Sequence, residues 1–306
     1  MSYIATPSRT RHILEKYDLR LTKRWGQNFL IDPRMAEKIA RASCFEGEGI
    51  IEIGPGIGSL TEFLVNRAGY VVAVEIDPRL VTVLKEEFKG VNNLKVLNGD
   101  VLKQDLDSLA KDCFPSGLAA VKYSAVGNLP YYVTTPIMFH LFEKTTVLRS
   151  ATLMMQREVA ERIMAAPGTR DYGALSVTTR YYADARLLTR VSSKNFFPQP
   201  DIESVVVHFN VHEKPPVDTA DVGLFFEVVR AAFNQRRKTL LNCLSNSVAG
   251  LNKDAARDIL LRAGIDPGIR GEALDLEGFA AAANSAAEYL EEAGVETSRA
   301  GEGELK

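Results

Sequence analysis

Short apolar runs alternate with amphipathic stretches as far as about Ala185, and this alternation limits the possible fold more than any other feature. The runs GIIEIG, YVVAVEID, LKVLNGD, YSAVGNL and ATLMMQ are predicted strands. Stretches with helical spacing separate most of them, including SLTEFLVNRA, for which we expect Ser59 to be the N-cap. Buried strands that alternate with helices are typical of a parallel, doubly wound α/β sheet.

The pattern changes after this point. ARLLTRVS and ESVVVHFN are predicted strands with no helix between them, and they could close the sheet edge as an antiparallel pair. HEKPPVD has the composition of a linker, and LFFEVVRAAFNQRRKTLLNCLSN begins a series of helical patterns. We expect a basic, mobile arm over residues 1–24, a Rossmann-like α/β domain over 25–212, a small all-α domain over 217–292 and a disordered tail over 293–306.

The composition excludes several classes of protein. The three cysteines, Cys44, Cys113 and Cys243, are far apart and form no CxxC pair, so we expect neither a disulfide framework nor a metal site. No apolar run reaches the roughly 18–20 residues that span a membrane. The sequence therefore predicts a soluble, cytoplasmic protein, and nothing in it requires more than a monomer.

The distribution of charge along the chain says more about possible nucleic-acid binding than the net charge does. The net charge is −2, but residues 1–24 hold six Lys and Arg against two acids, and residues 227–238 hold four against one. Local rather than net charge sets the attraction for phosphates. These segments fit nucleic-acid binding and, on charge alone, fit an ordinary solvated surface equally well.

A glycine-rich loop follows the first strand of the predicted sheet. In EIGPGIGSLTEF, Gly54, Gly56 and Gly58 stand between a strand and a helix, where glycines let the backbone approach a ligand. The spacing is G-x-G-x-G rather than the G-x-G-x-x-G of dinucleotide-binding folds. The loop alone is compatible with a tight structural turn or with a nicotinamide-dependent oxidoreductase.

Polar residues also close the following strands. Glu75 ends the second strand, where it could accept ribose hydroxyls, and Asp100 ends the third, where it could accept from an adenine amino group. Asn128 ends the fourth. Ligands of open α/β sheets bind at the carboxyl ends of the strands, so we expect these three residues and Gly54 to meet at one edge.

The stretch GNLPYYVTTP contains groups that could bind and activate an amino group. The side-chain carbonyl of Asn128 and the backbone carbonyl of Leu129, held by Pro130, are two acceptors that could bind both hydrogens of an exocyclic amino group. Such binding favours a pyramidal nitrogen whose lone pair can attack an electrophile. Tyr131 could stack on the base that carries this amino group. A turn with a packed Tyr is the simpler alternative.

These segments together resemble one family. NLPY is a variant of the (N/D)PP(Y/F) motif of methyltransferases that use S-adenosylmethionine to modify amino groups. RWGQNFLID, EIGPGIGSLTE, GNLPYYVTTP, FFPQPDIES and AFNQRRKTL are similar, in this order, to the small-subunit (16S) rRNA adenine N6,N6-dimethyltransferases of the KsgA or RsmA type. The similarity runs from about Trp25 into the helical domain.

The resemblance implies an enzyme that dimethylates two adjacent adenines near the 3′ end of 16S rRNA, with S-adenosylmethionine as cosubstrate and an immature small ribosomal subunit as partner. It implies that Phe196 covers the face of the target adenine opposite Tyr131. The implied cosubstrate residues are Asn28, Leu30, Gly54, Gly56, Glu75, Asp100 and Asn128. FNQRRK resembles the basic signature of the family and implies RNA contacts at Arg236, Arg237 and Lys238, although these three cannot share one helix face and some could be structural. Apart from the resemblance, Lys23 and Arg24 of the basic arm could hold RNA phosphates.

Two alternatives remain open at this stage. An Erm-type enzyme that methylates an adenine of 23S rRNA has the same catalytic core. A ribosome-assembly factor could keep the fold and bind RNA without catalysis, although the intact glycine loop, Glu75, Asp100 and NLPY argue against a loss of activity.

Overall fold

The largest sheet has seven strands in the order β4-β3-β2-β5-β6-β9-β7. The computed structural model describes residues 2–19, 27–45, 47–118, 122–248 and 251–294. β2 to β6 pair in parallel, and β9 runs antiparallel to β6. The strands are β2 (Gly49–Ile53), β3 (Tyr70–Glu75), β4 (Leu94–Asn98), β5 (Tyr123–Asn128), β6 (Leu148–Gln156), β7 (Ala183–Val191) and β9 (Ser204–Val211). The predicted parallel α/β sheet is confirmed.

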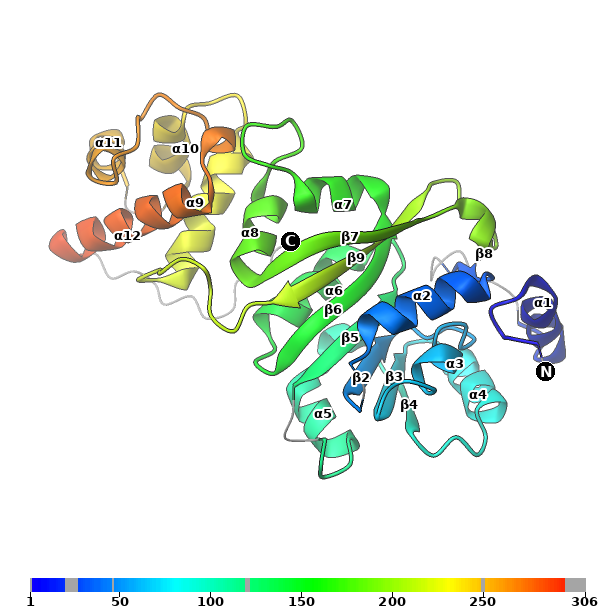
Figure 1. The fold of residues 1–306 in the computed structure, drawn as a ribbon. Helices are drawn as coiled ribbons and strands as arrows, with labels where there is room; N and C mark the ends of the chain where they lie inside the picture. Colours follow the sequence, from blue (N-terminus) through cyan, green and yellow to red (C-terminus); the bar gives the residue numbers. More distant parts are fainter. Residues whose placement is uncertain (1, 20–26, 46, 119–121, 249–250, 295–306) are drawn as a thin grey trace. The chain divides into compact units, whose positions relative to one another are not determined.

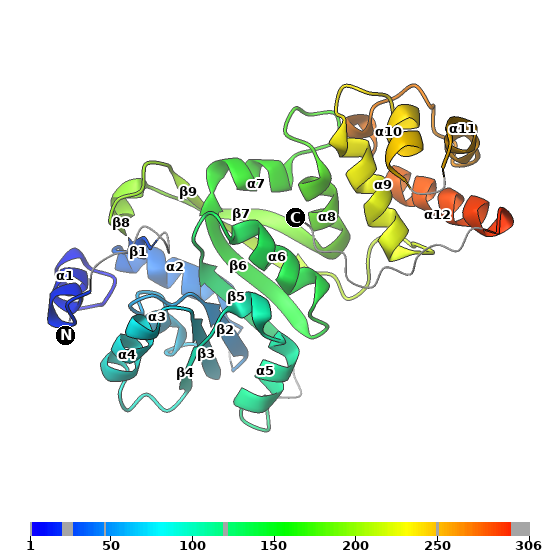
Figure 2. The same cartoon turned by 180° about the vertical axis from the view of Figure 1, so that it is seen from behind.

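Helices cover both faces of this sheet. α2 (Pro33–Ser43) lies on one face in Figure 1, and α6 (Thr134–Glu143) lies on the other in Figure 2. α2 begins at Asp32, whose carboxylate accepts from the backbone N–H groups of Arg34 and Met35. Because both faces are covered, every residue of β2 is buried, as expected for a strand in the middle of a parallel sheet.

The other helices packed with this sheet differ in part from the expectation. They are α3 (Thr61–Leu64), α4 (Pro78–Glu87), α5 (Leu106–Cys113) and the start of α7 (Arg157–Met164). The predicted helix over SLTEFLVNRA is reduced to the four residues of α3, and Ser59 does not cap it. Gly56 and Gly58 have positive φ angles of 62° and 93°, so the turn that they form delays the start of the helix. α5 lies outside the predicted elements.

The N-terminal segment forms a packed helix, so the expectation of a mobile arm is wrong for α1 (Pro7–Lys16). Ile13 is fully buried against α4 and the glycine loop. Arg9 and Lys16 both pair with Glu87 of α4, and the Tyr17 hydroxyl donates to the same carboxylate. These cations neutralise a carboxylate of the protein and are therefore not free for RNA.

Two of the predicted regions fall outside the described residues. Lys23 and Arg24 lie there, as do residues 295–306 of the expected tail. The chain after the gap begins with residues 27 and 28 and then β1 (Phe29–Leu30), which pairs antiparallel with β8 (Phe196–Phe197) in a separate two-stranded sheet.

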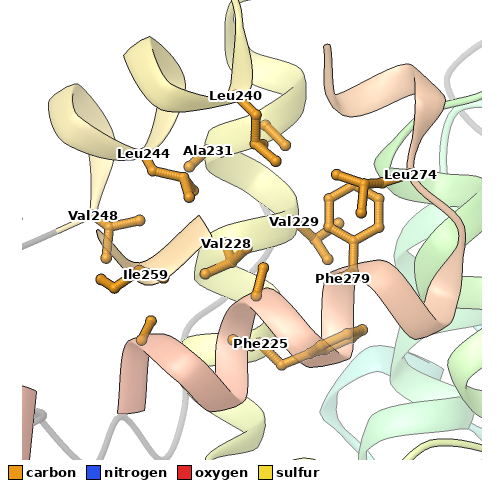
Figure 3. Packing of buried hydrophobic residues seen from close by; sticks show 14 of the residues in the cluster. Phe225, Val228, Val229, Ala231, Leu240, Leu244, Val248, Ile259, Leu274 and Phe279 are labelled. Carbon is orange, nitrogen blue, oxygen red and sulfur yellow. The ribbon is translucent and has the colours of Figure 1, made fainter. Parts of the chain in front are cut away.

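The chain divides into two compact units. Unit 1 comprises Met1–Ala160 and Asp184–Val211, and unit 2 comprises Glu161–Ala183 and His212–Lys306. Unit 2 thus takes in an earlier segment, which includes α8 (Ala174–Tyr182), as well as the helices after the linker. Those are α9 (Val222–Asn234), α10 (Leu240–Ser247), α11 (Lys253–Arg262) and α12 (Leu276–Glu292). Figure 3 shows apolar side chains from these four helices in one core, with Phe225 and Phe279 fully buried.

A turn divides the stretch with a helical pattern, LFFEVVRAAFNQRRKTLLNCLSN, into two helices. α9 ends at Asn234 and α10 begins at Leu240, so the basic cluster lies between the two helices. Arg236 donates to the backbone carbonyls of Arg170 and Tyr172 at 2.5 and 3.1 Å. Arg236 therefore ties two segments of unit 2 together.

Glu87 anchors the N-terminal helix, and we predict that Glu87→Ala lowers the free energy of unfolding by about 1.5–3 kcal/mol, the usual range for hydrogen bonds to a charged group. Thermal and urea denaturation measure this loss, and hydrogen exchange of residues 7–16 is expected to accelerate. Glu86→Ala, at an exposed neighbouring position, is the control and is expected to have little effect. Equal stability of the two variants would show that α1 is held by apolar packing alone.

Candidate active site

A solvent-open cavity lies at the carboxyl ends of the parallel strands of unit 1. The structure brings most of the predicted site residues to its wall. These are Asn28, Leu30, Gly54, Gly56, Glu75, Asp100, Asn128, Leu129, Pro130 and Tyr131. They come from the segment before α2, the glycine loop and the ends of β3, β4 and β5, as expected for ligands bound at strand ends.

The glycine loop turns tightly at the edge of the cavity. Gly54 and Gly56 have φ angles of 64° and 62°, which side chains other than glycine rarely adopt. A Cβ atom at Gly56 would also lie 3.0 Å from the ring of Phe29. The Gly54 N–H donates to the carbonyl of Val74 at 3.0 Å, so the loop continues the β2–β3 ladder by one bond.

Glu75 holds the loop from the neighbouring strand. Its side chain is 4% exposed, and its two carboxylate oxygens accept from the backbone N–H groups of Gly56 at 3.0 Å and Asp77 at 2.9 Å. Burial raises the pKa of Glu75 to about 7 in spite of these donors. Each oxygen has a second lone pair, so the carboxylate can still accept from a ligand hydroxyl.

Glu52 is a second buried acid in the same wall. It is 1% exposed, and its Oε2 has no hydrogen-bond partner among the described residues. Burial raises the pKa of Glu52 to about 8, and the nearby charge of Glu75 adds to the rise. Glu52 was not among the site residues predicted from the sequence, although an acid inside an apolar strand was a visible signal.

Asp100 and two apolar side chains form the next part of the wall. One oxygen of Asp100 accepts from the backbone N–H of Leu102 at 3.1 Å, which leaves the other oxygen for a ligand. Ile76 and Leu102 line the cavity and remain 40% and 36% exposed. Exposed apolar side chains flanked by acids suit a flat ring with polar edges. Neither apolar residue was predicted from the sequence.

Asn128 has a defined orientation in the structure. Its Nδ2 donates to the backbone carbonyl of Asn28 at 2.9 Å. Because that carbonyl can only accept, the NH2 end of the side chain must face it. The Oδ1 atom is therefore available to accept from another donor. The next residue, Leu129, packs its buried side chain over Gly127, where an added Cβ would lie 2.7 Å from Leu129 Cδ2.

The two tyrosines after Pro130 differ in their surroundings. The Tyr131 hydroxyl forms a 2.8 Å hydrogen bond with Ser204, and burial raises the pKa of Tyr131. This bond fixes the ring, which is half-buried at the cavity wall. Tyr132 also lines the cavity and is 59% exposed.

Phe196 is placed differently from the expectation. It pairs with Leu30 in the small β1–β8 sheet, is 3% exposed and belongs to an apolar cluster under α2. It does not line the cavity. In this arrangement its ring is in the core, so it can cover a base on Tyr131 only after a movement of the β8 segment.

Two absences apply to the described part of the chain. No helix there is both long and apolar enough to cross a bilayer, and no group of three or more His, Cys, Asp or Glu residues is placed to hold a metal ion.

The raised pKa of Glu52 generates a prediction about stability and pH. An acid whose pKa is higher in the folded state keeps its proton after the unfolded chain has lost it, so stability falls as pH rises from about 4.5 to about 8. We predict that Glu52→Gln removes this fall and stabilises the protein more at about pH 8.5 than at about pH 5.5. Thermal denaturation at both pH values tests it. A stability difference that does not change with pH would contradict the buried, protonated acid.

The comparisons with known proteins agree with this geometry. Residues 19–281 match the sequence model of a family described as ribosomal RNA adenine dimethylase. A "Ribosomal RNA small subunit methyltransferase A" of Alkaliphilus oremlandii is 44% identical over 95% of this chain and 100% of its own length. A protein of the same name from Bacillus mycoides is 46% identical over 93% of this chain and 98% of its own length.

Two solved structures are also similar. A dimethyladenosine transferase from Plasmodium falciparum has a TM-score of 0.69 and 26% identity, covering 83% of this chain and 95% of that one. The 23S rRNA methyltransferase ErmE has a TM-score of 0.63 and 25% identity, covering 85% of this chain and 100% of that one. The predicted methyltransferase fold and rRNA adenine dimethyltransferase activity are confirmed, and the Erm-type alternative is not better supported. The chain belongs to the ribosomal RNA adenine dimethylase family.

Proposed function

We propose that this enzyme dimethylates the N6 amino groups of two adjacent adenines near the 3′ end of 16S rRNA, in an immature small ribosomal subunit. We further propose that it acts as a cytoplasmic monomer. The observation that carries the proposal is the orientation of Asn128, whose Oδ1 is left as an acceptor in the wall of a cavity suited to a nucleoside. The 44–46% identity to proteins named as small-subunit methyltransferases supports this choice of substrate.

The residues of the cavity wall fit S-adenosylmethionine. The two hydroxyls of a ribose match the carboxylate of Glu75, and an adenine ring matches the apolar pair Ile76 and Leu102 with Asp100 at its edge. The glycine loop brings backbone close to the ligand, and Asn28 and Leu30 also line the cavity. When bound, S-adenosylmethionine supplies an electrophilic methyl group on a sulfonium.

The NLPY motif acts on the target amino group. Its nitrogen lone pair is delocalised into the adenine ring and is a poor nucleophile. Asn128 Oδ1 and the Leu129 carbonyl together accept both N–H bonds, which favours the pyramidal nitrogen of the transition state. Tyr131, held by Ser204, offers a fixed ring for stacking. Phe196 covers the other face of the base if the β8 segment moves toward it.

The basic turn between α9 and α10 divides into two roles. Arg236 binds backbone carbonyls within unit 2, so we assign it to structure. Arg237 and Lys238 are exposed and remain candidates for phosphate contacts. Lys23 and Arg24 also remain candidates.

Two alternatives predict different behaviour. The Erm-type enzyme predicts transfer to 23S rRNA, and its structural relative is 25% identical to this chain. A non-catalytic assembly factor predicts RNA binding without transfer, but it does not explain an intact set of acids and an oriented Asn128.

Asn128→Ala is expected to lower the rate of methyl transfer by about 10²-fold, the typical cost of removing one hydrogen-bonding group from a transition state. S-Adenosylmethionine affinity should change far less, because the amino group is engaged chiefly during transfer. Single-turnover transfer and calorimetry separate the two effects. If both fall by the same factor, Asn128 serves only to hold the cosubstrate through Asn28.

The test of the proposed substrate uses tritiated S-adenosylmethionine with undermethylated small subunits, large subunits and duplex DNA. The modified nucleotides are mapped by digestion and mass spectrometry. We expect dimethyladenine at two adjacent positions of the small-subunit RNA only. Label in large-subunit RNA would select the Erm-type alternative, and RNA binding without transfer would select the assembly factor.

A further inference from the structure

The three exposed residues of α2 are basic, namely Arg34, Lys38 and Arg41, and the side chain of the neighbouring Glu37 is 43% exposed. The three basic residues are spaced four and three residues apart, so they lie along one face of the helix. Glu37 is the acid of this helix, and it pairs with Arg67. The outer face of α2 is therefore a row of positive charge.

Another exposed helix face of unit 1 carries both signs. α4 exposes Arg79, Lys85 and Glu86, a mixture that is usual for a solvated surface. Solubility alone does not require charges of one sign, so the row on α2 calls for a separate explanation.

The β7 side of the sheet extends this row. Lys38 Nζ donates to Thr189 Oγ1 of β7 at 2.9 Å, so the helix and the strand lie side by side. Asn195, just beyond β7, donates to Asp32 at the start of α2 at 2.9 Å. Lys194, next to Asn195 in sequence, is exposed, whereas Arg190 directly follows Thr189 on the strand and therefore lies on the other face of β7. We call Arg34, Lys38, Arg41 and Lys194 the α2–β7 basic surface.

Little acid neutralises this surface. Within the part of the chain that the structure describes, Arg41 and Lys194 form no ion pair. Arg34 is 94% exposed, and its contact with Asp32 at 3.7 Å is of the kind that contributes little. The positive potential therefore remains available to a phosphate-bearing partner.

The surface begins beside the cavity. Leu30 lines the cavity, and α2 starts three positions later at Pro33. Arg34 to Arg41 spans a rise of about 10 Å along the helix. A polynucleotide whose target base enters the cavity could thus continue along α2.

We propose that the α2–β7 basic surface binds the phosphate backbone of the rRNA strand next to the target adenines. This inference rests on the proposed function and adds a docking site on unit 1. Its contacts are electrostatic and independent of base sequence, so they position the strand, while the cavity selects the adenine.

The test is a matched pair of triple variants. Arg34→Gln, Lys38→Gln and Arg41→Gln together remove the α2 row. Lys85→Gln, Lys89→Gln and Lys111→Gln remove the same charge from exposed positions elsewhere in unit 1. Binding to a protein-free RNA fragment that contains the target adenines, and to undermethylated small subunits, is measured across a salt series.

We expect the affinity of the α2 variant for RNA to be at least about tenfold lower. We also expect the slope of log K against log[salt] to become shallower by about 2–3, which is roughly one for each phosphate that the variant no longer binds. S-Adenosylmethionine affinity and melting temperature should match those of the control. Equal slopes for the two variants would overturn the proposal. Weaker binding to subunits but not to protein-free RNA would also overturn it and indicate a ribosomal protein as partner. Failure of the wild-type enzyme to methylate any rRNA would instead refute the proposed function.

Discussion

The parallel pairing of β2 with β3 and β5 is the constraint on which the active site depends. Parallel strands in register end at the same edge, so Ile53 lies beside both Val74 and Gly127. The next residues of the three strands are Gly54, Glu75 and Asn128, and all three line the cavity. The Gly54–Val74 hydrogen bond carries the ladder into the glycine loop. Residues far apart in sequence form one site because the register of the parallel strands places them at the same edge of the sheet.

Two acids, Glu52 and Glu75, are buried in the wall of the cavity. Glu52 and Glu75 are both almost fully buried, and burial raises the pKa of each. Such acids are costly to ionise in the free protein. A ligand with positive charge, as S-adenosylmethionine has, would favour their ionised forms.

Much of the fold and the site could be predicted because local rules govern them. The strand and helix periods predict the sheet, and the strand ends predict Glu75, Asp100 and Asn128. The remaining features depend on contacts between distant segments. The bond from Asn128 to Asn28 joins residues 100 positions apart.

Residues in two basic groups that we expected to contact RNA have partners within the protein instead, and the reason is the same for both groups. The basic residues of the N-terminal segment suggested an RNA arm, but two of them, Arg9 and Lys16, pair with Glu87 of α4. Arg236 was grouped with Arg237 and Lys238, but carbonyls of a distant segment bind it. The sequence shows whether a side chain is apolar or charged, and the periodicity shows on which face of a helix or strand it lies. Neither identifies the residue that it will contact in the folded protein.

The central claim is that two acceptors of NLPY hold both hydrogens of the target amino group. A crystal structure of the enzyme with S-adenosylhomocysteine and a short RNA containing the target adenine tests this most directly. The account predicts that Asn128 Oδ1 and the Leu129 carbonyl oxygen each lie about 2.7–3.2 Å from the amino nitrogen. An amino group bound by other residues, or an Asn128 with its NH2 turned toward the base, would contradict it.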